Sequence, residues 1–164
     1  MSNTVKTIII AFSLFIVDAF ILNQGGIALF ILIIVLPFMA VRTIKKRKDS
    51  IELKKRLIAM GIYAVMIVLV FASNHLNNVI AKIRAEAIIE ACEKYMVKNS
   101  VYPSELSLLV PNFLKEIPNA KYIFISNQFK YIASNDRHSL MFISMPPFGR
   151  YYYIMEEKKW KYID

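Results

Sequence analysis

The chain is poor in the residues that cross-link small proteins or hold metals. Its 164 residues include one cysteine, Cys92, and two histidines, His75 and His138. A single cysteine excludes an intrachain disulfide, and two histidines far apart in the sequence give no metal-ligand spacing. Four glycines and six prolines are too few for a low-complexity linker. We therefore predict a folded chain with no metal and no cofactor.

The sequence also lacks the patterns that carry catalysis. It has no recognisable Ser-His-Asp set, no glycine-rich loop that would cradle a phosphate, and no pair of catalytic carboxylates. The prediction is a protein that acts by binding and not as an enzyme, with no small-molecule substrate recognised.

Apolar residues, in contrast, are abundant. They make up 57% of the chain, and the mean hydropathy of +0.45 is too high for an ordinary soluble domain of this size. Three apolar runs approach the roughly 20 residues that cross a bilayer core, and flanking polar residues extend each one. They are Thr7–Leu22, Ile27–Val41 and Leu57–Ser73. We predict three membrane spans; the other interpretation of the first two runs is a core hairpin in a soluble protein.

The segment "NQGG", Asn23 to Gly26, joins the first two runs and has the residues of a tight turn between antiparallel spans. Lys6, before the first run, would also suit a signal peptide. A second apolar run follows directly, however, and no small-x-small cleavage pattern is present. The first run is therefore predicted to be a permanent span.

Positive charge is concentrated between the second and third runs. The net charge is +9, and the segment from Arg42 to Arg56 holds eight basic and two acidic residues. A nucleic-acid site would need aromatic or groove-reading elements beside the charge, and this segment has none. Basic residues in short loops stay in the cytoplasm, so the segment is predicted to determine topology and to contact anionic lipid. Its basic residues are Arg42, Lys45, Lys46, Arg47, Lys48, Lys54, Lys55 and Arg56.

This orientation puts the N-terminus in the cytoplasm and everything after Ser73 outside it. The predicted location is the inner (cytoplasmic) membrane of a bacterium. The predicted partners are membrane lipid and a protein in the membrane or periplasm, and no nucleic acid.

The third run continues into an amphipathic segment. Between Leu57 and Asn99 there is no proline and only one glycine, so a single helix is predicted. The predicted apolar face from His75 onward holds Leu76, Ile80, Ile83, Ala87, Ile88, Ala91 and Tyr95. Opposite it lies an acidic stripe, either a solvated surface or a contact for a basic partner, formed by Glu86, Glu90 and Glu93. Cys92, near the apolar side, is predicted to be a core thiol.

The C-terminal part is predicted to be a small antiparallel sheet packed on this helix. Val101 to Pro118 breaks the helix, and five runs rich in Tyr, Ile and Phe follow, with turn residues between them. The runs are Lys121–Ser126, Phe129–Ser134, Ser139–Met145, Arg150–Met155 and Trp160–Ile163. The expected fold is a three-span helical part plus a small α+β domain. Its divisions are a two-span hairpin with the basic loop (1–56), the third span and amphipathic helix (57–99), and the extracytoplasmic domain (100–164).

This arrangement resembles the type IV pilins and the pseudopilins of type II secretion systems. The resemblance covers about residues 57–164, and its most specific part is "KNSVYPSELSLL", Lys98 to Leu109. In that family an apolar half-helix anchors the subunit and packs the fibre, and the globular part faces outward. The chain departs from the family because it lacks the prepilin cleavage motif: the fifth residue after Gly61 is Met66 instead of a glutamate, and two further spans precede it.

The resemblance implies a membrane-anchored, pilin-like protein that binds other proteins. It would be an accessory or minor component of a type IV pilus or a type II secretion system. An alternative from another class is a membrane-anchored immunity or exclusion protein that intercepts a toxin arriving in the periplasm.

Three single residues are further candidates. Asp18 lies inside the first apolar run, where a charge costs about 2.5 kcal/mol or more on insertion scales. It either handles protons or is a protonated, hydrogen-bonded packing residue. Tyr151 and Tyr153 belong to a "YYY" segment of a predicted strand that alternates between two faces, and an exposed tyrosine there would suit a protein partner.

Overall fold

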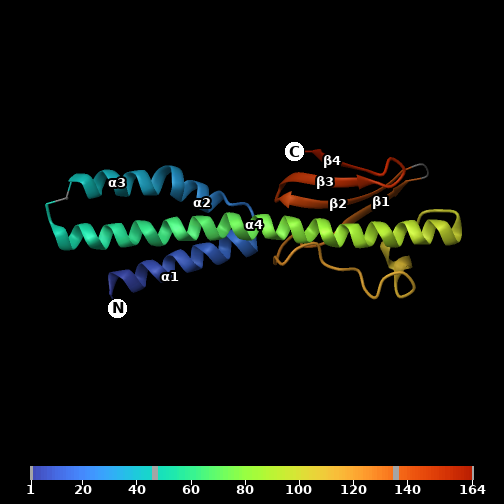
Figure 1. Ribbon diagram of the computed structural model, residues 1–164, viewed down its shortest axis with the longest axis horizontal. Coiled ribbons are helices and arrows are strands. Elements are labelled where there is room, and N and C mark those ends of the chain that lie inside the picture. Colours follow the sequence, from blue (N-terminus) through green and yellow to red (C-terminus); the bar gives the residue numbers. More distant parts are fainter. Residues whose placement is uncertain (1, 46–47, 135–136, 164) are drawn as a thin grey trace. The chain divides into compact units, whose positions relative to one another are not determined.

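The structure is a computed structural model that describes residues 2–45, 48–134 and 137–163. It divides into two compact units, Met1–His75 (unit 1) and Leu76–Asp164 (unit 2). One helix, α4 (Ser50–Asn99), supplies residues to both units (Figure 1). The single long helix predicted from the third apolar run is therefore present, and it begins earlier than expected.

Unit 1 consists of helices that coincide with the three apolar runs. Two continuous helical stretches of 20 residues and the longer α4 are long and apolar enough to cross a membrane. The first stretch is α1 (Asn3–Ile16) followed by the π-helical η1 (Val17–Leu22). The second is α2 (Gly26–Phe30), the π-helical η2 (Ile31–Val35) and α3 (Leu36–Lys45).

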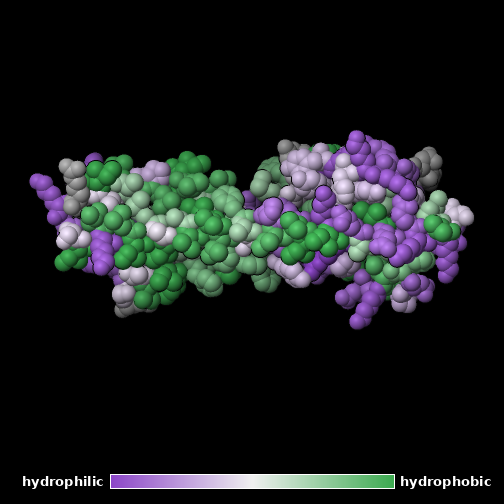
Figure 2. Space-filling model, in the orientation of Figure 1, coloured by the Kyte–Doolittle hydropathy of each residue, from purple (hydrophilic) through white to green (hydrophobic). Residues whose placement is uncertain are grey.

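The core of unit 1 is small. Ala11 of α1 and Ala28 of α2 pack with Met66 and Val70 of α4, because small side chains let the helices approach closely. Most other apolar side chains point outward, as Phe12 and Ile33 do. Figure 2 shows hydrophobic residues dominating the visible surface of this unit. In water such a surface would be unfavourable, whereas lipid solvates it.

The turn between η1 and α2 adopts left-handed backbone conformations at Asn23 (φ 52°) and Gly25 (φ 73°). Gly25 also lies close to α4, since a Cβ added there would come within 3.1 Å of the Phe71 ring. Glycine is therefore required by both conformation and space. The tight turn predicted from "NQGG" is confirmed.

Unit 2 is an α+β unit in which a sheet packs on the second half of α4. The strands are β1 (Lys130–Ser134), β2 (Arg137–Met145), β3 (Phe148–Ile154) and β4 (Lys159–Ile163). They form an antiparallel meander in the order β1-β2-β3-β4 (Figure 1). Between α4 and the sheet lies the short 3₁₀ helix η3 (Leu106–Leu109). The predicted helix and antiparallel sheet are confirmed at this level.

The core of unit 2 joins α4, η3 and the sheet. Ile88 and Cys92 of α4 are fully buried against Leu109 of η3 and Leu140 of β2. Cys92 is the core thiol that the sequence predicted, and burial raises its pKa to about 12.

The buried stripe of α4 matches the predicted apolar face only in part. Ile88 and Ala91 are buried as predicted, whereas Leu76 and Ile83 are exposed and Ala81 and Ala85 are buried in addition. The physical reason is the size of the alanines, which allows the loops and strands to lie close to the helix backbone.

The segment Lys121–Ser126 is not a strand, which corrects the prediction of five strands. Lys121 and Ile123 are buried, but the backbone N–H of Tyr122 donates to the Asn77 side chain instead of a neighbouring strand. Ser126 has φ 56°, outside the β region. Alternation of buried and exposed residues is therefore present without strand pairing.

Candidate functional site

The predicted topology residues lie at one end of the helices of unit 1. Arg42 and Lys45 are in α3, Lys48 precedes α4, and the remaining described ones are in the first turns of α4, namely Lys54, Lys55 and Arg56. Lys46 and Arg47 lie outside the described residues. The Asp49 side chain accepts hydrogen bonds from the backbone N–H groups of the first turn of α4, so the helix starts within the basic segment.

Most of these cations are exposed. Arg56 is half-buried, because its guanidinium donates to Glu52 at 3.1 Å, one turn earlier on α4. The Arg42 guanidinium lies 4.3 Å from the centroid of the Phe38 ring. The result is a band of solvated positive charge next to apolar helix ends, which is the arrangement expected of a cationic loop at a membrane surface.

Asp18 is fully buried in η1 and has a backbone partner in the next helix. Its Oδ2 accepts a hydrogen bond of 2.8 Å from the N–H of Ala28, in the first turn of α2. N–H groups in the first turn of a helix have no intrahelical acceptor, and a carboxyl oxygen satisfies one of them. Asp18 thus links the first two helical stretches. If Asp18 is a hydrogen-bonded packing residue, this is the hydrogen bond that it needs. Proton handling stays a prediction.

Further buried polar groups lie at the same turn. Asn23 is buried, and Asn74 of α4 approaches Gly25, since a Cβ added at Gly25 would lie 3.5 Å from its Nδ2. Among the described residues, Asp18 Oδ1, Asn74 Oδ1 and both polar side-chain atoms of Asn23 have no hydrogen-bond partner. Sequence reasoning named only Asp18. The sequence shows that Asn23 and Asn74 are polar, but it does not show that they are buried, because their burial depends on how α4 packs.

The acidic stripe on α4 divides into two environments. Glu86 and Glu90 are exposed, and Lys94 pairs with Glu90 at 2.7 Å, which lowers the pKa of that carboxyl. Glu93 is half-buried, accepts a hydrogen bond of 3.1 Å from the Tyr102 hydroxyl and lies 3.8 Å from Lys158 Nζ. Glu86 and Glu90 therefore remain candidates for contact with a basic partner, whereas Glu93 has intramolecular partners.

Tyr151 and Tyr153 face the same side of the sheet, as strand alternation predicts. Tyr151 is paired with Phe142, and Tyr153 with Leu140 and Trp160. Tyr153 is half-buried against the core, and its ring lies 5.4 Å from that of Trp160. Tyr151 is more exposed, so it is the better candidate of the two for contact with a partner.

A cluster that the sequence did not predict surrounds His138, near the start of β2. Its Nδ1 lies 2.7 Å from Oε1 of Glu156, and its backbone N–H donates to the same carboxylate at 3.0 Å. The rings of Tyr102 and Tyr131 lie 5.3 and 6.3 Å from the imidazole. The Tyr131 hydroxyl donates to the carbonyl of Pro103 at 2.9 Å. The cluster joins β1, β2 and the loop after α4.

Desolvation shapes the ionisation of this cluster. Burial first, and then the hydrogen bond to Glu93, raise the pKa of Tyr102 to about 12. Desolvation would raise the pKa of Glu156, but the hydrogen bonds from the backbone and ring of His138 outweigh it and lower that pKa. Glu156 is therefore held as a carboxylate. His138 and Glu156 are 18 residues apart, and sequence spacing gives no signal for such a pair.

The cluster borders a hollow of about 480 Å³ that Ser104 and Ser134 also line. A histidine held by a carboxylate can accept or donate a proton, but catalysis of acyl transfer also needs a nucleophile bonded to the histidine. Among the residues that the structure describes, no hydrogen bond joins His138 to a serine. The clear role of the cluster is to tie the sheet to the end of α4.

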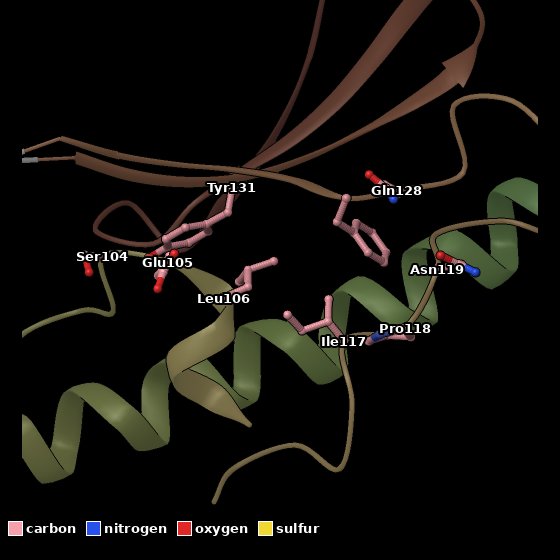
Figure 3. A pocket seen from close by; sticks show the side chains of 9 residues that line it. Ser104, Glu105, Leu106, Ile117, Pro118, Asn119, Gln128 and Tyr131 are labelled. Carbon is pink, nitrogen blue, oxygen red and sulfur yellow. The ribbon is translucent and has the colours of Figure 1, made fainter. Parts of the chain in front are cut away.

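A second hollow, of about 440 Å³, lies between η3 and the start of β1. Figure 3 shows Leu106, Ile117 and Tyr131 around its centre and the amides of Asn119 and Gln128 at one edge. Small-molecule sites usually combine an enclosed apolar cavity with several converging polar groups. Here the Tyr131 hydroxyl already donates to the Pro103 carbonyl, so this polar group is used within the chain.

No family model matches the chain, and no curated protein or solved structure shows a significant match to it. Within the described residues, no group of three or more His, Cys, Asp or Glu side chains could hold a metal ion.

Proposed function

We propose that the protein is a membrane-anchored, pilin-like protein that acts by binding another protein outside the cytoplasm. In this proposal it is an accessory or minor component of a type IV pilus or a type II secretion system. The observation that carries the proposal is the change along α4. The first half of this helix exposes apolar side chains, whereas its second half packs against a four-stranded antiparallel meander.

The helices of unit 1 support the anchoring part of the proposal. All three stretches meet the length and hydropathy of membrane spans, and the cationic residues gather where the second stretch ends and α4 begins. Positive charge between two spans favours the cytoplasmic side. We therefore propose the bacterial inner membrane, with the N-terminus in the cytoplasm and unit 2 in the periplasm.

The surface of unit 2 supports binding as the activity. Glu86 and Glu90 form an exposed acidic edge on α4, and Tyr151 offers a partly exposed aromatic ring. Tyrosine is enriched in protein interfaces because it combines a large apolar ring with a polar hydroxyl. These residues are the proposed contacts for a protein partner.

Site-specific photo-crosslinking in the native host tests the function. A benzophenone amino acid is placed at Glu90 or Tyr151, and at Val68 of the apolar half of α4 as the control. We expect one adduct from the two unit 2 positions that contains a pilin, a pseudopilin or another part of the assembly machine, and that is absent from Val68.

Two outcomes would contradict the proposal. An adduct with a secreted toxin, together with loss of protection when the protein is deleted, would instead establish the immunity function. Identical products from Glu90, Tyr151 and Val68 would mean that unit 2 contributes no specific contact. Phosphatase fusions after residues 48 and 163 test the orientation separately, and only the second is expected to be active.

A further inference from the structure

Exposed apolar side chains gather at one end of unit 2. Tyr122 and Phe124 are 62% and 77% exposed, in the loop before β1, and Phe148 is 62% exposed at the β2–β3 turn. Ile125 and Met145 are exposed beside them in sequence. Exposed single hydrophobic residues are common, but five on two neighbouring loops need a physical explanation.

The two loops are joined by a buried lysine. Lys121 Nζ donates a hydrogen bond of 2.6 Å to the carbonyl of Ser144, next to Met145 at the end of β2. Met145 in turn faces Phe148 across the β2–β3 turn. The loop from Lys121 to Ser126 is therefore held against the end of β2, next to the β2–β3 turn. We call the exposed apolar residues of these two segments the apolar rim: Tyr122, Phe124, Ile125, Met145 and Phe148.

The apolar rim lies at the end of unit 2 where α4 begins its second half. The backbone N–H of Tyr122 donates to Oδ1 of Asn77 at 3.1 Å, and Asn77 is the second residue of the unit. Ala81, one turn further along α4, packs with Phe142 of β2. Arg84, two turns further along, lies with its guanidinium 4.2 Å from the centroid of the Tyr122 ring and donates to the carbonyl of Asn119.

The length of α4 puts Asn77 at a defined depth. The apolar run starts at Leu57, and 20 residues at 1.5 Å per residue cover about 30 Å, the thickness of a bilayer core. Leu76 is the twentieth residue, so Asn77 is the first beyond the hydrocarbon. The interfacial layer extends roughly 5–7 Å further on each side, and aromatic side chains and arginines concentrate there. The apolar rim is bonded to the helix at this depth.

We propose that the apolar rim inserts into the interfacial layer of the bilayer and docks unit 2 on the outer membrane–water boundary. This inference rests on the proposed membrane anchor and adds a second lipid contact to it. The aromatic rings occupy the boundary between headgroups and acyl chains. Arg84, beside the Tyr122 ring, and Arg150, which donates to Pro147 in the β2–β3 turn, are the cations available to contact lipid phosphates.

The opposite end of unit 2 supports lipid as the occupant of the rim. It carries Glu93, Glu156, Glu157 and Lys158, which form ion pairs among themselves and with His138, Arg137 and Lys161. The ion pairs of unit 2 therefore gather at the far end of α4, whereas the aromatic residues of the rim lie at the end where the chain enters unit 2. A protein partner or a second copy would not require the apolar residues to lie at this depth.

Tryptophan fluorescence in proteoliposomes tests the inference on the full chain. Trp160, the only native tryptophan, is first replaced by phenylalanine. Phe124→Trp and Phe148→Trp then report on the rim, and Val68→Trp, in the middle of the third apolar run, reports on insertion itself. Val97→Trp is the matched control, because Val97 is 85% exposed on α4 and lies 20 residues beyond Asn77, or about 30 Å along the helix.

We expect blue-shifted emission from both rim positions and quenching of at least twofold by phosphatidylcholine brominated near the top of its acyl chains. Val97→Trp should emit as in water and remain unquenched. The inference is overturned if the rim positions stay unquenched while Val68→Trp is quenched, since the anchor would then be present without docking.

Three other results would also overturn it. Equal quenching at Val97 and Phe124 would mean that unit 2 lies on the membrane without using the rim. A blue shift that grows with protein density but is insensitive to bromolipid would mean that a second copy covers the rim. If Val68→Trp is not quenched either, the membrane anchor has failed, and the inference fails with it.

Discussion

The two halves of α4 place similar residues in different surroundings. In unit 1, Val68 is 66% exposed, and Val65 and Leu69 of the same helix are exposed as well. In unit 2, Ile88 of the same helix is fully buried under the sheet. A helix that is apolar all round is solvated by lipid or by protein, whereas an amphipathic one needs a single covered face. Along one continuous helix, therefore, the sequence pattern decides whether the apolar side chains are exposed or form a single buried stripe.

Among the described residues, each unit buries one acidic or basic side chain, and both of these side chains have a backbone partner. In unit 1 Asp18 accepts from the N–H of Ala28, and in unit 2 Lys121 donates to the carbonyl of Ser144. Among the described residues, neither has an oppositely charged side chain within salt-bridge distance. Burial of an ionisable group with a single hydrogen bond is costly, so each marks a contact that fixes local packing.

The largest expected effect is a difference in the free energy of unfolding between a variant on the buried side of α4 and one on its exposed side in unit 2. Ile88→Ala should lower the free energy of unfolding of unit 2 by about 2–5 kcal/mol, because it leaves a cavity between α4 and β2. Ile83→Ala, on the exposed side, should change it by less than about 0.5 kcal/mol. Denaturant unfolding in detergent, followed by Trp160 fluorescence, measures both. Equal effects would mean that the sheet does not pack on the Ile88 side.

The next largest effect is a difference in membrane insertion between variants in the two halves of α4. Val68→Arg should disfavour insertion by about 2.5–3.5 kcal/mol, because it places a cation at the middle of the proposed span. Val97→Arg, at a position that is 85% exposed, should leave insertion unchanged. The membrane-retained fraction after alkaline carbonate extraction gives the comparison. Loss of insertion in both variants, or in neither, would remove the distinction between the halves.

Sequence reasoning predicted the elements of the fold better than their contacts. The three helical stretches, the single long helix and the meander follow from local periodicity and turn residues, such as Asn23 and Gly25, which are local properties of the chain. The buried stripe of α4 was predicted only in part, since Ile88 and Ala91 are buried as expected but Ile83 is exposed. Hydropathy favoured Ile83 over Ala81, whereas close packing favours the smaller side chain.

For the candidate sites too, the sequence predicted individual residues better than their contacts. Asp18 could be singled out from its position in an apolar run, but its bond to Ala28 depends on the turn between the two stretches. His138 and Glu156 meet only because β2 and β3 pair. Lys121 was assigned to a strand because it begins a run rich in Tyr, Ile and Phe that is bounded by turn residues. Such contacts arise between segments distant in sequence, and periodicity contains no information about them.

A smaller effect tests the buried carboxyl of unit 1. Asp18→Ala should destabilise the protein by about 1–3 kcal/mol, because it leaves the N–H of Ala28 without an acceptor inside the helices. Asp18→Asn keeps an acceptor oxygen, so it should cost less than about 1 kcal/mol. The melting temperature in detergent ranks the variants. A stable Asp18→Asn protein that loses its cellular function would indicate proton handling instead.

The smallest effect concerns the lysine of unit 2 and depends on pH. Burial lowers the pKa of Lys121 from 10.5 to about 8, so the folded chain releases this proton at a lower pH than the unfolded chain does. Between these values unfolding takes up a proton, and rising pH therefore stabilises the folded state, by about 1 kcal/mol from pH 8 to pH 9.

Lys121→Met should remove this component, whereas Lys130→Met, at an exposed position of β1, should keep it. Unfolding of unit 2 at pH 8 and pH 9, measured by Trp160 fluorescence in detergent, compares the two variants with the native chain. The comparison between variants is needed because Cys92, whose pKa is raised by burial, contributes the opposite trend as pH approaches 9. Parallel pH profiles for the native chain and Lys121→Met would mean that Lys121 is solvated, and the bond that joins the loop before β1 to the end of β2 would be absent.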